Sequence, residues 1–130
     1  MDSDRLKASP PFDSLDAEAL RHFTVWVEEL KVDAGKHLVD QGDYAYELFA
    51  IEDGTAEVLR DGEPIAELGA GEFFGEMGVL ARAHRNATVV AKTPMRMLTL
   101  SHWDVKRLHR ESPETIEQLR RAFEERSAAQ

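Results

Sequence analysis

Turn signals at short and regular intervals constrain the fold of this 130-residue chain more than any other feature. Between residues 31 and 100, apolar and polar residues alternate in short runs, which are typical of β-strands. Each run ends at residues that favour turns, namely Ala34-Gly35, Gly42-Asp43, Asp53-Gly54, Asp61-Gly62, residues 69–71 and Thr93-Pro94. About eight short strands at this spacing predict a jelly-roll-like barrel.

Two of these runs carry more specific signals. Residues 46–51 are apolar on both faces, which indicates a strand that is covered on both sides. Asp61-Gly62 lies between two runs of alternating residues and is a strong signal for a two-residue β-hairpin.

Helical patterns flank the predicted strands. Asp16 is typical of an N-cap, and the apolar residues after it recur at helical spacing: Leu20, Phe23, Val27 and Leu30. Ser101 and Asp104 form a capping box that begins a second helix. Ser112-Pro113 begins a third, with an apolar stripe of Ile116, Leu119 and Phe123. Residues 1–11 are polar and contain two prolines, so we expect a loosely held lead-in.

Composition excludes several classes of protein. The chain is 42% hydrophobic and 32% charged, as in ordinary globular proteins. It has no cysteine, so disulfides, thiolate metal sites and cysteine nucleophiles are excluded. No signal-peptide pattern and no apolar run of about 20 residues is present, so we expect a cytoplasmic location and no membrane segment. A net charge of −9 argues against nucleic acid as a partner.

The segment GEFFGEMGVL at residues 71–80, followed by RNATV at residues 85–89, is the candidate binding site. Gly71, Gly75 and Gly78 stand among bulky residues, so the backbone must bend there or approach something closely. A short helix beginning near Gly75 would direct backbone N–H groups at an anion, and Arg85 would add a planar fork. An ionised Glu76 only accepts hydrogen bonds, which suits a sugar hydroxyl. The pattern predicts a site for a ribose that carries a phosphate, whereas the alternative is a glycine-rich loop with a surface Glu–Arg pair.

The negative net charge does not exclude an anionic ligand. Exposed charges more than about 8 Å apart are largely screened at physiological salt. Arg82, His84 and Arg85 also make this loop locally positive.

This segment resembles the phosphate-binding cassette of the cyclic nucleotide-binding domain family, which has a Gly-Glu pair, two small or aliphatic residues, a short loop and Arg-x-Ala-Thr. The resemblance extends through VDAGKHLVDQGD, ELFAIEDGTAEVL and the terminal helices. It implies that cAMP or cGMP is the ligand, with cAMP ahead as the commoner ligand of the family. It also implies that Glu76 binds the ribose 2′-hydroxyl and Arg85 the cyclic phosphate, aided by backbone N–H groups of Met77, Gly78 and Ala87.

The resemblance explains Gly75 by the sugar or the turn, which a Cβ would crowd. The predicted binding residues are Phe74, Gly75, Glu76, Met77, Gly78, Arg85, Asn86 and Ala87. Asn86 departs from the family, which usually has Ala, Ser or Thr there, and a hydroxyl is associated with guanine. Its amide could meet a guanine edge, a phosphate oxygen or only its own loop.

The resemblance further implies that a C-terminal helix closes as a lid over the base. Leu119, Arg120 and Phe123 are the candidate lid residues, although Leu119 and Phe123 could instead be the core side of the helix, which we favour. We also expect a hinge near residues 111–113, because Pro113 interrupts the helical hydrogen bonds.

We therefore predict one α+β domain, mainly β, over residues 1–130. It is an eight-stranded antiparallel β-roll with an N-terminal helix, a short cassette helix and two C-terminal helices. The lead-in spans residues 1–12, the helical region 13–30, the roll 31–100 and the C-terminal helices 101–127.

The expected function is that of a cyclic nucleotide sensor whose effector, a protein or domain, is unidentified. The chain could stand alone or belong to a longer polypeptide. The alternative is a β-roll that has lost its ligand and acts through a protein partner, although the presence of both Glu76 and Arg85 argues against that loss. We expect no enzyme and no metal or other cofactor, because the five histidines lack metal-binding spacing and no nucleophile elbow or phosphate-loop lysine motif occurs.

Overall fold

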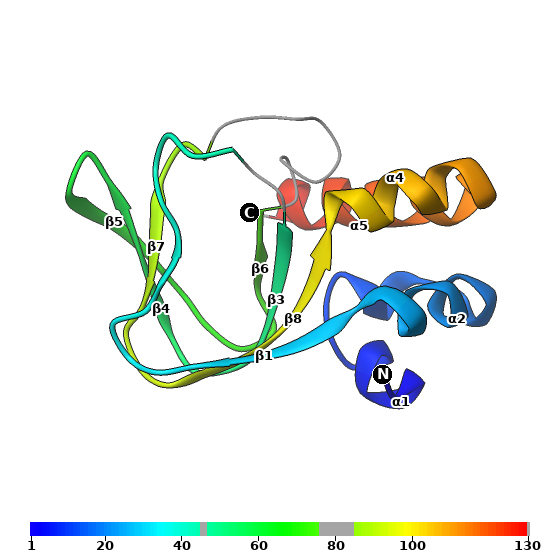
Figure 1. Ribbon diagram of the computed structural model, residues 1–130, viewed down its shortest axis with the longest axis horizontal. Coiled ribbons are helices and arrows are strands. Elements are labelled where there is room, and N and C mark those ends of the chain that lie inside the picture. The colour runs from blue at the N-terminus through cyan, green and yellow to red at the C-terminus, as the bar shows by residue number, and fades with distance from the viewer. Residues whose placement is uncertain (45–46, 76–84, 130) are drawn as a thin grey trace.

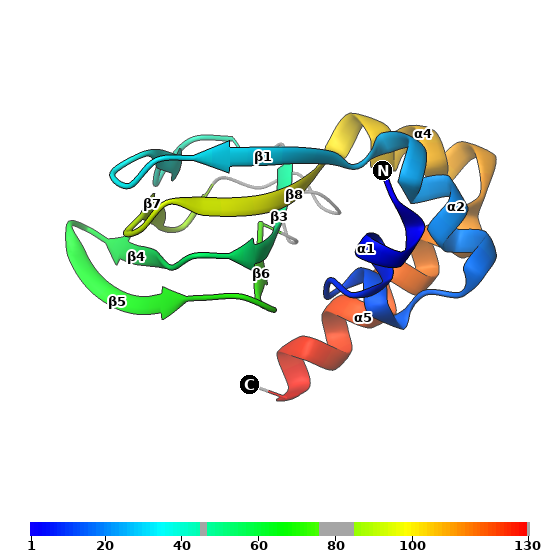
Figure 2. The same cartoon turned by 90° about the horizontal axis from the view of Figure 1, so that it is seen from below.

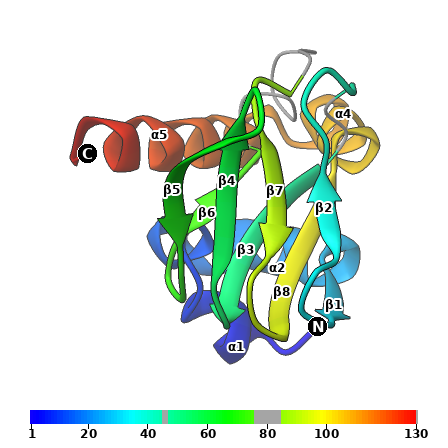
Figure 3. The same ribbon diagram turned by 90° about the vertical axis from the view of Figure 1, so that its left-hand side faces the viewer.

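The computed structural model describes residues 1–44, 47–75 and 85–129, and the strands in these ranges form two four-stranded sheets (Figure 1). One sheet has the order β1 (Glu28–Val32), β8 (Met95–Ser101), β3 (Glu47–Asp53) and β6 (Phe73–Phe74). The other has the order β2 (His37–Val39), β7 (Thr88–Ala91), β4 (Ala56–Arg60) and β5 (Glu63–Leu68), and Figure 3 shows it in front of the first. All neighbouring strands are antiparallel, which confirms the predicted β-roll.

The predicted hairpin joins β4 to β5. Asp61 and Gly62 both have positive φ, 52° and 81°, and Arg60 pairs with Glu63 on either side of them. Positive φ at both central residues defines the type I′ turn, whose twist matches that of the strands.

Strand β3 is covered on both faces, as its sequence predicts. Leu48 and Ala50 belong to a core cluster that the sheet shares with the helices. Phe49 and Ile51 point the opposite way, into a second cluster between the two sheets. The neighbouring strand β8 divides its apolar residues in the same manner, and it lies at the centre of the first sheet.

Helix α2 (Ala17–Trp26) begins where the sequence predicts and ends earlier. The Asp16 carboxylate accepts a hydrogen bond of 2.9 Å from the Ala19 N–H, so Asp16 is the N-cap. Val27 already has extended backbone, and Leu30 lies in β1 opposite Met97. The prediction that the helical region reaches residue 30 was therefore wrong, because residues 28–32 also alternate with the period of a strand.

The N-terminal segment is packed, and the predicted loose lead-in was wrong. Helix α1 (Ser3–Lys7) buries Leu6 completely, and the 3₁₀ helix η1 (Phe12–Ser14) brings Phe12 to 5.5 Å from the ring of Phe23. Arg5 donates two hydrogen bonds to the Glu52 carboxylate, of 2.8 and 2.5 Å, and lies 3.0 Å from Glu29. These contacts fasten α1 to strands β3 and β1.

Two helices follow β8, with the predicted break between them. In α4 (His102–Glu111) the Ser101 hydroxyl accepts from the Asp104 N–H at 3.3 Å, which confirms the cap. Ser112 separates α4 from α5 (Pro113–Ala129), and its N–H closes the last turn of α4 on the Leu108 carbonyl. Figures 1 and 2 show α1, α2, α4 and α5 gathered at one end of the sheets. The predicted cassette helix falls on residues 76–84, outside the described residues.

Candidate functional site

The described residues of the candidate site lie where β6 ends and β7 begins. The chain leaves β6 at Phe74-Gly75 and is described again from Arg85, which precedes β7 (Figure 1). Gly75 and Arg85, on either side of the residues that are not described, therefore lie together at one end of the roll. The other predicted binding residues in this motif, Glu76, Met77 and Gly78, lie outside the described residues.

Arg85 is held by the segment that leads into β3. Its Nη2 donates a hydrogen bond of 2.7 Å to the Glu47 carbonyl. Its backbone N–H donates to the Asp43 carbonyl at 2.7 Å, and its own carbonyl accepts from the Gly42 N–H at 2.9 Å. Contacts with Gly42, Asp43 and Glu47 thus hold the backbone of Arg85 and orient its guanidinium.

Gly75 lies directly against this arginine. Its φ is +89°, which non-glycine residues rarely adopt. A Cβ at this position would lie 2.4 Å from the Glu47 carbonyl oxygen and 2.6 Å from Arg85 Nη1. The sequence explained this glycine by the sugar or the turn; the structure shows that the Arg85 side chain and the Glu47 carbonyl also require it.

The remaining described members of the site differ in exposure. Phe74 is buried and stacks on Phe49, with ring centroids 4.9 Å apart, so its ring belongs to the core between the sheets. Ala87 is buried immediately before β7. Asn86 is exposed, and its carbonyl accepts from Arg60 Nε at 3.3 Å. Direct ligand contacts by these residues stay predictions.

A hollow of about 130 Å³ lies beside Arg85. It is smaller than the roughly 300–1,000 Å³ of typical ligand pockets, so the described residues alone do not enclose a whole nucleotide. Asp40, Asp43 and Glu47 also line it, and the Asp40 carboxylate is hydrogen-bonded to His37 Nδ1 at 2.7 Å. For an anion to bind here, its attraction to the positive charge of Arg85 would have to exceed its repulsion by these carboxylates.

Sequence reasoning missed the part that Gly42, Asp43 and Glu47 play in this site. Glu47 and Arg85 are 38 residues apart in the chain, and the Glu47 contact uses a backbone carbonyl, which any residue type would supply. Glu47 lies beside Gly75 because β3 pairs with β6, so a prediction of this strand pairing could have placed the two residues together.

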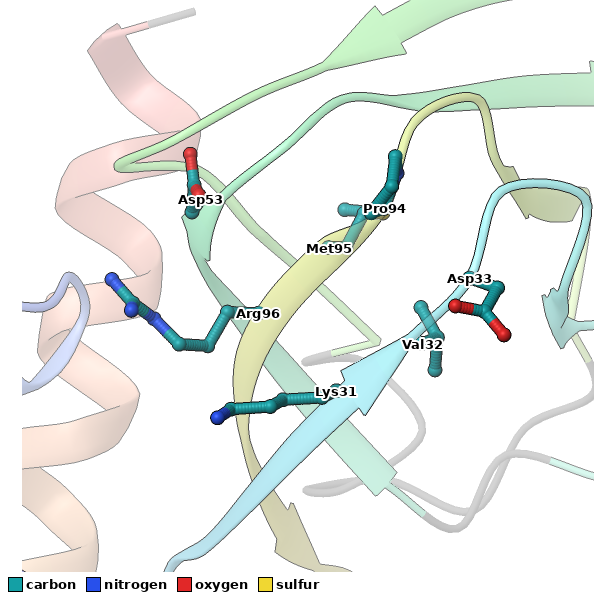
Figure 4. Close-up of a pocket in the computed structure, with 7 residues that line it drawn as sticks. All are labelled: Lys31, Val32, Asp33, Asp53, Pro94, Met95 and Arg96. Carbon is teal, nitrogen blue, oxygen red and sulfur yellow. The ribbon is translucent and has the colours of Figure 1, made fainter.

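A second hollow, of about 360 Å³, lies beside Met95, where β8 begins (Figure 4). Lys31 and Arg96, which are paired across β1 and β8, point in the same direction, while Asp33 points away from them. Asp53 also lines this hollow, and Arg96 Nε lies 3.7 Å from Glu52. Charges of both signs, beside the Arg5–Glu52 contacts, indicate a structural ion-pair region, and no sequence-predicted site residue lies there.

Within the described ranges, no group of three or more His, Asp or Glu residues is placed to hold a metal ion. No helix in these ranges is long and apolar enough to cross a membrane.

Comparison with known proteins fixes the family. The model of the family described as "Cyclic nucleotide-binding domain" matches residues 29–112, a range that includes all of β1 except Glu28, the strands from β2 to β8, Gly75 and Arg85. The chain belongs to the cyclic nucleotide-binding domain family.

Relatives of this cyclic nucleotide-binding domain include larger proteins. The chain is 36% identical over 89 residues to a cAMP-dependent protein kinase regulatory subunit of Yarrowia lipolytica, covering 68% of the chain and 24% of the relative. It is 35% identical over 119 residues to a cyclic nucleotide-gated potassium channel of Rhizobium etli, covering 92% of the chain and 33% of the relative. The chain thus spans a quarter to a third of the length of these relatives.

A solved structure confirms the fold. A protein of Geobacter metallireducens described as a putative cyclic nucleotide-binding protein superposes with a TM-score of 0.88 at 18% identity, over 99% of this chain and 97% of the other. At this identity the likeness shows the β-roll fold alone.

The candidate lid residues of this domain lie in its core or on the outer face of α5. Leu119 and Phe123 are buried in the cluster shared by helices and sheet, which confirms the core interpretation, and Phe123 lies 5.5 Å from the ring of Phe73 in β6. Arg120 pairs with Glu117 and Glu124 of its own helix, and the Glu117 hydrogen bond raises the pKa of its guanidinium. None of the three lines the hollow beside Arg85.

Proposed function

We propose that this domain binds a cyclic nucleotide monophosphate, with cAMP ahead of cGMP, and acts as a regulatory sensor without catalytic activity. One observation supports the proposal most strongly: Arg85 is anchored to Glu47 and packed on Gly75, at the cassette position of a chain that belongs to this family. Similarity to a cAMP-dependent kinase regulatory subunit supports cAMP.

Arg85 would bind the phosphate because its fork can donate two hydrogen bonds to one phosphate group. A hydrogen bond to a charged group contributes about 1.5–3 kcal/mol. The anchor on Glu47 fixes the guanidinium before the ligand arrives, which reduces the entropy lost on binding. Glu76 would accept from the ribose 2′-hydroxyl, and the N–H groups of Met77, Gly78 and Ala87 would complete the phosphate site.

The base specificity would depend partly on Asn86. It is exposed and follows Arg85 in the chain, and its amide can both donate to and accept from a purine edge. The interpretation in which Asn86 serves only its own loop predicts that Asn86→Ala leaves the ratio of cAMP to cGMP affinity unchanged.

The cytoplasmic location of the protein stays a prediction.

The proposed response is closure of α5 over the base, with Ser112 as the hinge. Phe123 contacts Phe73, which lies two residues from Gly75, so a shift of the cassette can reach α5 through β6. Closure would have to replace core contacts of Leu119 and Phe123, and the ligand can drive it only by binding the closed form more tightly. Hydrogen exchange tests this: saturating cAMP should protect amides 116–123 more than those of α2, and equal protection would indicate stabilisation by mass action.

Thermal unfolding with cAMP, cGMP and 5′-AMP tests the binding proposal. A ligand at 100 times its Kd stabilises the folded state by about 2.7 kcal/mol, which raises the Tm by several degrees. We expect this rise for a cyclic nucleotide and a much smaller one for 5′-AMP. If neither cyclic nucleotide at millimolar concentration changes the Tm, the alternative of a ligand-free interaction domain is favoured.

A further inference from the structure

One face of helix α4 is both cationic and aromatic. Trp103, Lys106, Arg107 and Arg110 are all exposed and follow the helical spacing i, i+3, i+4 and i+7, while His102, Val105 and Leu108 form the buried face. Between this face and α5 lies a groove of about 530 Å³, whose lining also includes Val105, His109 and Ile116. We call it the α4 groove.

The charge of the α4 groove is opposite to that of the whole chain. Among the described residues its lining includes Lys106, Arg107 and Arg110 but no carboxylate, although the net charge of the chain is −9. Within the described part of the chain, none of these three cations lies in a salt bridge. A local excess of positive charge on an acidic domain attracts acidic groups and disfavours a basic partner.

Aromatic rings hold two of these cations in place. Lys106 Nζ lies 5.8 Å from the centroid of the Trp103 ring, and Arg107 lies 4.8 Å from the ring of Trp26 in α2. A ring face orients a cation without neutralising it, so both retain their charge for a partner. Trp103 itself is 58% exposed, which is unusual for so large an apolar side chain.

The shape of the groove indicates what could occupy it. Val105 and Ile116 are only 4% and 7% exposed, so the apolar floor is recessed behind the charged and aromatic residues. A recessed floor suits a side chain that protrudes from a peptide segment. A bilayer surface would instead require several protruding apolar residues, and among the described residues that line the groove Trp103 is the one apolar side chain that is exposed.

We propose that the α4 groove binds an acidic segment of a partner protein. An apolar side chain of that segment occupies the floor beside Val105 and Ile116, and its carboxylates pair with Lys106, Arg107 and Arg110. Trp103 packs against the side of the bound segment. Trp and Arg are among the residues that contribute most to binding at protein interfaces. The groove and the Arg85 site share no residue, so peptide binding can be measured without nucleotide, in the state in which Ile116 of α5 lines the groove.

Two synthetic helical peptides of about five turns provide the test. Each peptide has a leucine stripe and carries fluorescein at one end. The residues that flank the stripe are glutamate in the first peptide and glutamine in the second. Binding is followed by fluorescence anisotropy. The glutamate peptide should bind at least about tenfold more tightly than the glutamine peptide, and its affinity should fall as salt is added.

Charge-reversal variants assign the binding to the groove. Lys106→Glu with Arg110→Glu should weaken the glutamate peptide at least about tenfold. The matched control, Lys31→Glu with Lys36→Glu, makes the same change of net charge at exposed residues of the roll and should bind as wild type does. Trp103→Ala should weaken both peptides. Lys106→Gln with Arg110→Gln, which adds no new charge, checks that loss of binding does not reflect misfolding.

Four results of the peptide and vesicle assays would overturn the proposal. They are no binding of the glutamate peptide, equal binding of both peptides, equal losses in the two charge-reversed variants, and peptide binding replaced by binding to phosphatidylserine vesicles. Self-association that Trp103→Ala abolishes, without peptide binding, would show that a second copy occupies the groove and would also overturn it. A separate cAMP titration of each variant keeps failure of this proposal distinct from failure of nucleotide binding.

Discussion

Replacing Gly75 by alanine tests how the roll positions Arg85. The added Cβ would lie 2.4 Å from the Glu47 carbonyl oxygen and 2.6 Å from Arg85 Nη1, so the hydrogen bond between these two residues must be distorted. The positive φ of 89° adds about 1–2 kcal/mol of backbone strain for a residue with a Cβ. Overpacking typically costs about 1–3 kcal/mol more. We expect Gly75→Ala to lower the free energy of unfolding by about 2–5 kcal/mol.

Gly71→Ala is the matched control. Gly71 has nearly the same φ, 87°, but no atom lies within 4 Å of the position that its Cβ would take. This variant should lose only the strain of about 1–2 kcal/mol. The difference between the two variants therefore isolates the contact of Gly75 with Glu47 and Arg85.

Urea denaturation gives the two free energies, provided that the m-values agree. Cyclic nucleotide affinity should fall in Gly75→Ala, because Arg85 is displaced, and stay near wild type in Gly71→Ala. Equal losses of stability and affinity in both variants would refute the argument that Gly75 is required by close approach to Arg85.

Three further predictions concern single residues. If Glu76 binds the 2′-hydroxyl, a 2′-deoxy cyclic nucleotide should bind more weakly by about 1–3 kcal/mol, and Glu76→Gln should reduce that difference. The hydrogen bond from the Ala19 N–H lowers the pKa of the Asp16 carboxyl. The ionised carboxyl therefore contributes stability above about pH 4, and this contribution is lost as the pH falls through the lowered pKa. The Tm of Asp16→Asn should fall less than that of wild type between neutral and acid pH. Arg5→Met should cost about 1–3 kcal/mol in urea, because it leaves Glu52 with Arg96 alone at 3.7 Å.

Each of these has its own contradicting outcome. Equal affinity of ribo and deoxy ligands would show that Glu76 does not bind the sugar. An unchanged acid transition in Asp16→Asn would remove the N-cap as a source of pH dependence. An unchanged free energy of unfolding in Arg5→Met would contradict the role of the Arg5–Glu52 contacts. Arg5→Lys is the control, since it keeps the charge but not the bidentate geometry.

Features that depend on a few adjacent residues could be predicted from the sequence. The Asp61-Gly62 turn, the Asp16 cap and the break at Ser112 each arise from local backbone chemistry, and the structure has all three. The covered strand β3 was predictable because a run that is apolar on both faces must be buried on both.

Features that depend on residues far apart in the chain could not be predicted in this way. Leu6 is one apolar residue in a polar segment, and it is buried in the core cluster where the Arg5 contacts hold α1 against β1 and β3. Leu30 fits both the helical and the strand period, and pairing of β1 with β8 decides between them. At the site, the sequence identified Arg85 and Gly75, but the Glu47 carbonyl that holds Arg85 has no sequence signature.

Calorimetric titration of the wild-type domain and of Arg85→Ala with cAMP and with cGMP tests the central claim most directly. The account predicts saturable binding of a cyclic nucleotide to wild type and a loss of about 2–4 kcal/mol in Arg85→Ala, with Arg85→Lys recovering only part because a point charge cannot reproduce the fork. Binding of equal affinity by wild type and Arg85→Ala, or no heat with either nucleotide at millimolar concentration, would contradict it.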